Sequence, residues 1–201
     1  MKILKWLGIG LGAIVLLFVV IGFCLPRKFH VERGQFINAP PESIHAVISN
    51  LREWPTWTAW TIERYPDMRI DFSGPVDGVG AKQTWHGKSS GSGSIEITKS
   101  NPEEGIAYAF TFDGSPSTGG IGFFPGLDSG TLVTWYADGD LGMNPIARYF
   151  GLQMDRFMGP DFEKGLINLK KKVEAANTMA AAVEPLDGVK PAESPPSEDR
   201  K

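Results

Sequence analysis

The longest feature of the hydropathy pattern is an unbroken apolar run near the N-terminus. Residues Trp6 to Leu25, WLGIGLGAIVLLFVVIGFCL, include no charged, amide or hydroxyl side chain. Twenty helical residues rise about 30 Å, roughly the thickness of the hydrocarbon core of a bilayer. The run therefore predicts a single transmembrane helix, with residues 1–26 as a membrane anchor and the bilayer as a partner.

A cleaved signal peptide is the main alternative for this run, because lysines precede it. The apolar core of a signal peptide typically has about 7 to 15 residues and leads to a cleavage site with small side chains. This run is longer and ends in bulky Phe23, Cys24 and Leu25. A lipoprotein cysteine needs a small residue before it, and Phe23 precedes Cys24. We therefore favour an uncleaved anchor.

The positive residues that flank the run are nearly balanced, with Lys2 and Lys5 before it and Arg27 and Lys28 after it. The positive-inside rule consequently gives a weak signal. Because so few residues precede the span, we expect a short cytoplasmic tail and a soluble domain on the exported side, periplasmic or extracellular. The single cysteine, Cys24, lies within the span, so the soluble part cannot form a disulfide.

After the anchor, the pattern changes to short segments in which apolar and polar residues alternate. Residues 29–38 predict a first strand, and the segment APPESIHAVISNLREW predicts a short amphipathic helix that begins at its prolines. From Met68 onward, six segments of period two are separated by Gly, Pro, Asn and Asp, which is typical of hairpin-linked strands. These strands are expected over 68–74, 80–87, 91–100, 106–114, 118–124 and 131–141.

A long amphipathic helix is predicted from residue 144 or 145 to 176, with apolar residues every three or four positions. Gly159 and Pro160 should kink it or make it restart. A curved antiparallel sheet of seven strands can bury its concave face only by wrapping this helix, so the predicted class is α+β. Residues 177–201 are rich in Ala, Pro, Glu and Ser, and we expect a disordered tail there.

The net charge and the short motifs mainly exclude classes of function. The formal net charge of −3 gives no general basic field for nucleic acid. The motif G-x-S-x-G at Gly87–Gly91 has strand pattern on both sides, so it is interpreted as a hairpin turn rather than a nucleophile elbow. The three histidines are far apart in sequence, and His45 is expected at the surface. We predict no metal site, no cofactor and no assigned catalytic residue.

The order of elements, together with three segments, resembles the START-like (SRPBCC) superfamily, which includes the polyketide cyclase/dehydrase group. The segments are INAPPESIHAVISNLREWPTWTAW, GVGAKQTWHG and GPDFEKGLINLKKKVE. The resemblance covers most of residues 27–176, the predicted domain. It implies a helix-grip fold in which the sheet and the long helix enclose an apolar cavity. The anchor and the tail depart from the soluble members.

Aromatic residues are the candidate lining of such a cavity, because ligand sites are mainly apolar with few polar groups. Alternation puts Phe110 and Phe112 on the same face as Tyr108, and Gln83 on the same face as Trp85. For any single ring, core packing is the simpler interpretation. The candidate ligand-binding residues are Trp57, Trp60, Trp85, Phe110, Phe112, Trp135 and Tyr136.

Three hypotheses for function follow. The leading one is a membrane-anchored domain that binds a hydrophobic small molecule or lipid without chemistry. The second is an enzyme of the polyketide cyclase/dehydrase kind, which needs a buried polar pair inside the cavity; His86, Asp71 and Glu96 are the residues to check, although each is more typical of a solvated strand. The third is a structural or interaction module whose own side chains fill its interior.

Overall fold

The computed structural model describes residues 2–126 and 130–183. The chain begins with α1 (Lys2–Cys24), which leads into the domain. The domain consists of β1 (Lys28–Ile37), α2 (Pro41–Ile48), the 3-10 helix η1 (Leu51–Thr56), β2 (Arg69–Ser73), β3 (Lys82–Gly87), β4 (Gly91–Asn101), β5 (Gly105–Phe112), β6 (Ser115–Pro125), β7 (Thr131–Asp140), α3 (Pro145–Gly151) and α4 (Met154–Val183).

The seven strands form one antiparallel sheet in the order β1-β7-β6-β5-β4-β3-β2. Six consecutive hairpin-linked strands make a meander, and the first strand joins it beside the last, as predicted. Gly87–Gly91 is the turn between β3 and β4, which confirms the hairpin interpretation of the G-x-S-x-G motif. Gly105 opens β5 with φ of 102°, and a Cβ there would overlap the carbonyl oxygen of Ile121. This position therefore needs glycine.

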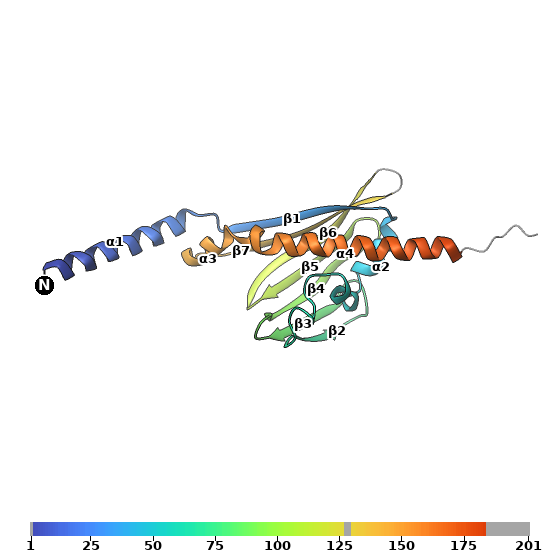
Figure 1. Ribbon diagram of the computed structural model, residues 1–201, viewed down its shortest axis with the longest axis horizontal. Coiled ribbons are helices and arrows are strands. Elements are labelled where there is room, and N and C mark those ends of the chain that lie inside the picture. Colours follow the sequence, from blue (N-terminus) through green and yellow to red (C-terminus); the bar gives the residue numbers. More distant parts are fainter. Residues whose placement is uncertain (1, 127–129, 184–201) are drawn as a thin grey trace, which may run out of the picture.

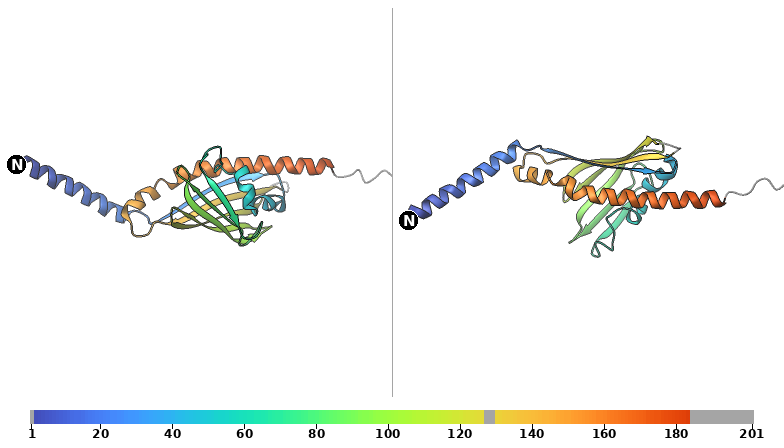
Figure 2. Two further views of the ribbon diagram at one scale, coloured as in Figure 1. Left: turned by 90° about the horizontal axis from the view of Figure 1, so that it is seen from below. Right: turned by 45° about the horizontal axis from the view of Figure 1, so that its top comes forward.

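The long helix α4 lies across the concave face of the sheet, along β1 and β7 (Figure 1). Its inward side chains recur at three- and four-residue spacing, as expected for one helix face. They are Phe162, Leu166, Leu169 and Val173, each no more than 2% exposed. The views in Figure 2 show the sheet bending away from α4 toward β2 and β3. The arrangement confirms the predicted helix-grip fold.

The last helix is interrupted earlier than the sequence predicted, which was at Gly159 and Pro160. The break between α3 and α4 lies at Leu152 and Gln153, and α4 continues through Pro160. A proline removes one N–H donor and its ring crowds the carbonyl four residues earlier, yet the helix is continuous on both sides of Pro160. Gly159 has a different role, because a Cβ there would overlap the guanidinium of Arg33, which reaches Asp155 at 2.8 and 3.0 Å.

The start of the predicted tail also needs a correction. Residues 177–183, which were assigned to it, form the last two turns of α4. This segment is rich in alanine, the residue with the highest helix propensity, so the helix extends beyond the part that packs on the sheet. The remainder of the predicted tail, 184–201, lies outside the described residues.

The helix α1 projects from the domain rather than packing into it (Figure 1). Its segment Leu4–Cys24 is long and apolar enough to cross a membrane, and 6% of the most apolar part is buried. Leu11, Ile14 and Leu16 are each 65% exposed, which is costly in water and favourable in lipid.

Candidate functional site

A cluster of aromatic rings occupies the space between α4 and the sheet. The indole of Trp57 lies 5.3 Å from that of Trp54 and 5.1 Å from that of Trp135, between ring centroids. The Trp135 indole stacks on Phe162 of α4 at 4.3 Å with an interplanar angle of 6°. All four side chains are buried. The part of the interior under α4 is therefore filled by the protein's own side chains.

The buried hydroxyl of Tyr108 completes this cluster. Trp135 Nε1 donates a hydrogen bond to the Tyr108 hydroxyl oxygen at 2.7 Å, and Trp54 Nε1 donates to the Ile48 carbonyl at 2.9 Å. Burial raises the pKa of the Tyr108 hydroxyl well above its ordinary value, and the hydrogen bond from Trp135 offsets only part of that effect. The hydroxyl thus stays protonated at neutral pH and cannot act as a base.

The structure divides the predicted ligand-binding residues into three groups. Trp57 and Trp135 belong to the filled cluster, and Trp60 borders it, with its ring 6.1 Å from Trp135 and 6.2 Å from Phe162. Trp85 and Phe110 lie half-buried on the same inner face, farther from α4.

The remaining two predicted residues lie apart from these. Phe112 is 48% exposed at the end of β5. Tyr136 points to the outer face of the sheet, since its neighbours Trp135 and Ala137 are buried on the inner one. A Cβ at Gly120 would contact the Tyr136 ring, so Gly120 makes room for it there. A ligand on the inner face cannot reach Tyr136.

Burial on the inner face falls toward the end of the sheet that adjoins α1. Phe110 lies in a row across the sheet with Ser117, Gly139 and Phe29, next to the start of β1. The same trend runs along α4, where Met154 and Met158 are half-buried but Phe162, Leu166, Leu169 and Val173 are buried. We call the less filled part of this face the proximal inner face; its half-buried side chains are Gln83, Trp85 and Phe110 of the sheet and Met154 and Met158 of α4.

One polar atom on the proximal inner face has no partner. Gln83 lies opposite Ile95, which pairs with Phe110, so the amide and the Phe110 ring share a row of the sheet. Gln83 Oε1 is buried and accepts no hydrogen bond within the described structure. Leaving such an acceptor unpaired costs about 1–3 kcal/mol. Alternation places Gln83 beside Trp85, but the sequence alone gives no sign that its oxygen is unpaired.

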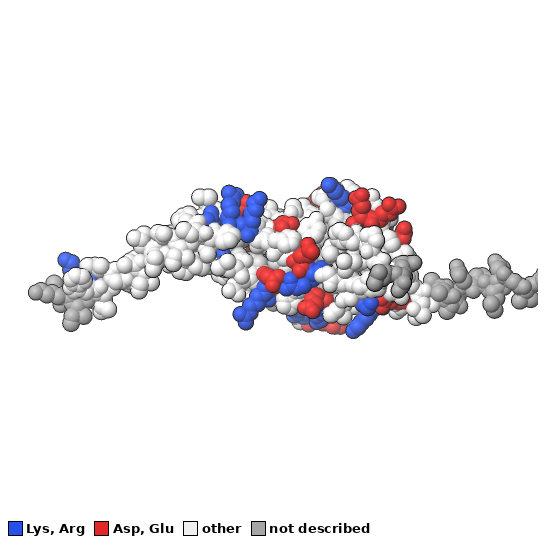
Figure 3. Space-filling model, turned by 90° about the horizontal axis from the view of Figure 1, so that it is seen from above, with Lys and Arg blue, Asp and Glu red and all other residues white. Residues whose placement is uncertain are grey.

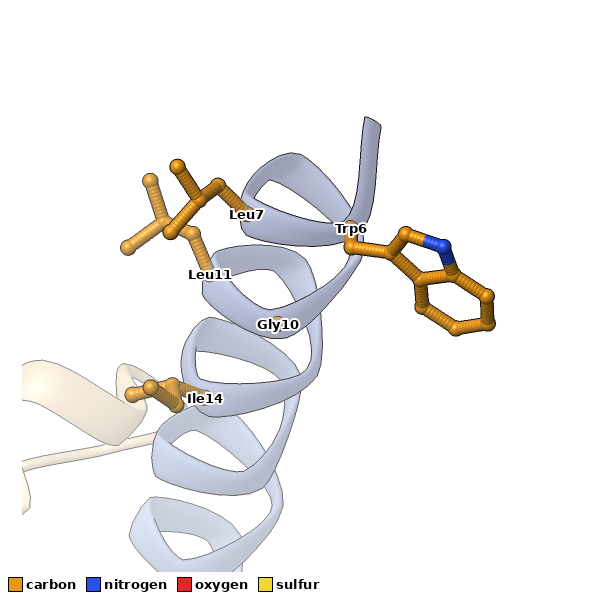
Figure 4. Close-up of a pocket in the computed structure, with 5 residues that line it drawn as sticks. All are labelled: Trp6, Leu7, Gly10, Leu11 and Ile14. Carbon is orange, nitrogen blue, oxygen red and sulfur yellow. The ribbon is translucent and has the colours of Figure 1, made fainter. Parts of the chain in front are cut away.

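Two open hollows of the described surface lie outside this region. One runs along α1 alone, lined by Trp6, Leu7, Gly10, Leu11 and Ile14 (Figure 4). The other lies at the β3–β4 turn, lined by Asp67, Arg69, His86, Gly87, Lys88 and Ser92. The apolar cavity that the resemblance implied is neither of these, because the indoles under α4 occupy much of the corresponding space.

The three acid or base candidates point away from the interior. His86, Asp71 and Glu96 are all exposed, and Glu96 accepts from Lys82 at 3.2 Å across the outer face. The inward positions of the same strands carry apolar side chains and Gln83. Within the described ranges, no group of three His, Cys, Asp or Glu side chains has a geometry suited to a metal ion. What the inner face offers is apolar contact and hydrogen bonding.

His45, expected at the surface, has a half-buried ring beside Ser100, with Nε2 2.8 Å from the hydroxyl oxygen. Burial lowers the pKa of His45, and the charge of Asp77 opposes this in part. Folding therefore favours the neutral ring. Its contribution to stability is complete above the unfolded pKa of about 6.5 and is lost as the pH falls through the lower folded value.

We expect the domain to lose stability as the pH falls below about 7, partly through His45. Urea unfolding midpoints at several pH values, measured for the wild type and His45→Gln, test this. The variant should show a smaller decrease over this range. The same decrease in both proteins would exclude His45 as a source. His30→Gln is the matched control, because Asp138 raises the pKa of His30 by accepting its hydrogen bond.

Comparison with known proteins agrees with this architecture. Three solved structures superpose on the domain, and each is covered to 98% of its own length. A protein from Thermus thermophilus has a TM-score of 0.52 and 18% identity over 73% of this chain, and XoxI from Bacillus cereus has a TM-score of 0.52 and 13% identity over 74% of it. The Zhui aromatase/cyclase from Streptomyces sp. R1128 has a TM-score of 0.51 and 17% identity over 74% of this chain. At these identities the likeness concerns the fold.

The family of this chain is identified by a comparison of its sequence with family models. Among curated proteins, no relative matches the chain. The family model described as polyketide cyclase / dehydrase and lipid transport, in contrast, matches residues 28–174, which is nearly the whole domain and most of the chain. The match confirms the resemblance to the SRPBCC superfamily and leaves α1 outside it. The chain belongs to the polyketide cyclase/dehydrase and lipid transport family.

Proposed function

We propose that this protein is held at a membrane by α1 and binds an apolar small molecule against the proximal inner face. The observation that carries the proposal is an unpaired buried acceptor, Gln83 Oε1, among half-buried apolar side chains such as Trp85 and Phe110. A ligand with an apolar body and one hydroxyl would complete the packing and donate to this oxygen. Rings, thioethers and one amide bind such a molecule without supplying an acid–base pair.

The place of this face in the fold favours a ligand that partitions into bilayers. Phe110 shares its row with Phe29, the second residue of β1, and α1 ends shortly before β1. Likewise, Met154 begins α4 directly after α3, which contacts α1. An apolar molecule that leaves the membrane beside α1 therefore meets the least filled part of the interior first. The family description, which includes lipid transport, is consistent with this choice.

Binding is tested on the domain expressed from Arg27 onward, because the solved structures that superpose on it consist almost entirely of this unit. We expect native mass spectrometry to show one bound molecule per chain after purification or after addition of dodecanol. Dodecyl methyl ether, which lacks the hydroxyl donor, should bind more weakly. Protein that carries neither and shows no thermal shift with either would favour the module with a filled core.

The variant Gln83→Leu should change stability and binding in opposite directions. Removing the unpaired acceptor should raise the free energy of unfolding of the empty domain, by up to about 1–3 kcal/mol. The same change should weaken dodecanol binding and leave the ether unaffected. Urea unfolding and the two titrations measure these effects.

The matched control is Gln35→Leu on β1, since the Gln35 amide donates to the Phe36 carbonyl instead of remaining unpaired there. The control should not raise stability and should not distinguish the two ligands. A Gln83→Leu domain that is less stable than the wild type, with unchanged binding of both ligands, would count against the site.

The side of the membrane is a further part of the proposal. The positive residues that flank the span, Lys2 and Lys5 before it and Arg27 and Lys28 after it, are nearly balanced, and within the proposal we place the domain on the exported side. Protease added to intact cells with a permeable outer layer should then digest the domain. Protection in intact cells, with digestion after lysis, would place it in the cytoplasm.

A further inference from the structure

The short helix α3 packs against the last turns of α1. The ring of Tyr149 stacks on Phe18 of α1, with centroids 4.1 Å apart and an interplanar angle of 4°. The Tyr149 hydroxyl donates to the Phe18 carbonyl at 2.7 Å. Gly22 allows the two helices to approach, because a Cβ there would lie 2.7 Å from the Pro145 Cβ. The contact between α3 and α1 therefore combines a ring stack, a hydrogen bond to the main chain and a close approach of the two helices.

A buried arginine strengthens this joint. Arg148 of α3 is 6% exposed and donates to the carbonyls of Phe23 at 2.6 Å and Leu25 at 3.3 Å. It also donates to the Gly142 carbonyl at 3.1 and 3.2 Å. The last carbonyls of a helix have no partner within the helix, so Arg148 satisfies groups that would otherwise be unpaired in or near lipid. The only charge on α3 is thus directed toward α1.

The connection between α1 and the sheet is fixed as well. Arg27 donates to both carboxylate oxygens of Asp140, at 3.0 and 2.5 Å, and its carbonyl accepts from the Leu141 N–H at 2.7 Å. The Arg27 guanidinium lowers the pKa of Asp140 to about 2, so the carboxylate is charged at any ordinary pH. α1 and the domain are therefore joined by contacts on both sides of residues 25–27.

These contacts determine the depth of α3 in a membrane that α1 crosses. Phe18 lies six residues before Cys24, where the apolar span ends. At a rise of 1.5 Å per residue, Phe18 is roughly 9 Å deeper than the end of the helix. Because α3 stacks on Phe18, it lies beside the outer part of the span. The other side chains of α3 therefore face the same surroundings as α1 at that depth.

The outward side chains of α3 match lipid. Ile146, Phe150 and the following Leu152 are 55%, 58% and 56% exposed, and none of them has a charged neighbour on α3 that points outward. Figure 3 shows α1 as a surface without charged side chains over most of its length, with Lys, Arg, Asp and Glu concentrated on the domain. The apolar surface of α3 continues the surface of the span.

We propose that α3 is a second membrane-contacting element, which lies in the bilayer interface with Ile146, Phe150 and Leu152 among the lipid chains. The proposal rests on the anchoring of the chain by α1. Helices with an apolar face bind at this depth, about 5–10 Å into the boundary between headgroups and acyl chains. α3 then gives the domain a second contact with the bilayer beside α1, which restricts its orientation relative to the membrane.

The test uses the full chain with Cys24→Ser, reconstituted into phosphatidylcholine and phosphatidylglycerol vesicles. An environment-sensitive fluorophore is placed on one cysteine at a time, at Leu11→Cys in α1, Phe150→Cys in α3 or Glu103→Cys in the exposed β4–β5 turn. Ile146→Cys is a second α3 position, in case one label disturbs the joint. Quenching by nitroxide-labelled lipids is measured for each. We expect strong quenching on α1 and at both α3 positions, and none at Glu103→Cys.

The outcomes separate this inference from the anchoring itself. Quenching on α1 but not at either α3 position would overturn the role of α3 and leave the anchor intact. Labels at Phe150→Cys that are shielded from water yet not quenched by lipid would indicate that protein, such as a second copy of the chain, covers α3. Absence of quenching at Leu11→Cys would contradict the anchor, and the inference for α3 with it.

Discussion

Replacing Trp135 with alanine should lower the free energy of unfolding of the domain by about 3–5 kcal/mol, the usual range for removing a large buried aromatic side chain. The side chain is 1% exposed and contacts Trp54, Trp57, Trp60 and Phe162 through its ring. The change also leaves the buried Tyr108 hydroxyl without its donor at 2.7 Å. Urea unfolding, followed by circular dichroism, measures the loss.

The neighbouring residue provides the matched control. Tyr136 is also aromatic and also on β7, but its side chain lies half-exposed on the outer face of the sheet. Tyr136→Ala should cost clearly less than Trp135→Ala. Equal losses in the two variants would mean that the inner face is not the principal core, which contradicts the helix-grip arrangement described above.

The second large effect concerns the span. Introducing arginine at both Leu11 and Val15 should release the protein from membranes, because each arginine near the centre of a transmembrane helix costs about 2.5–3.5 kcal/mol on the insertion scale. Both side chains are exposed on α1, at 65% for Leu11 and 55% for Val15. The fraction of full-length protein that sediments with membranes after alkaline carbonate extraction measures the effect.

The control for this experiment carries the same two charges elsewhere. Ile62 and Val79 are each 58% exposed in loops of the domain. Arginine at these two positions should leave membrane association unchanged. If the α1 variant still resists carbonate extraction as the wild type does, the span does not hold the chain at the membrane. Release of both variants would indicate unfolding or a different mode of association.

Most of the architecture was predictable because it depends on local patterns. Period-two alternation identified all seven strands, and their hairpin spacing identified the meander, which the observed strand order confirms. The break between α3 and α4 was misplaced because Pro160 is a visible local signal, whereas the actual break at Leu152 and Gln153 directly follows α3, which contacts α1. No local pattern encodes that contact.

The candidate site was less predictable, for a physical reason. Alternation shows which side chains share a face, and it grouped Phe110 with Tyr108 and Gln83 with Trp85 correctly. It does not show how deeply each position is covered, because that depends on which strands α4 crosses. Trp135 lies under α4 and is part of the filled core, while Trp85 lies four strands away and remains half-buried.

The most direct test of ligand binding at the proximal inner face is the nuclear magnetic resonance spectrum of the isotope-labelled domain with a nitroxide-labelled fatty alcohol. Each indole N–H gives a separate signal, so the tryptophans report on the place of the ligand. Broadening of the Trp85 signal, with Trp54 and Trp57 largely spared, is the predicted result. No broadening of any indole, or equal broadening of all of them, would contradict a ligand site on this face.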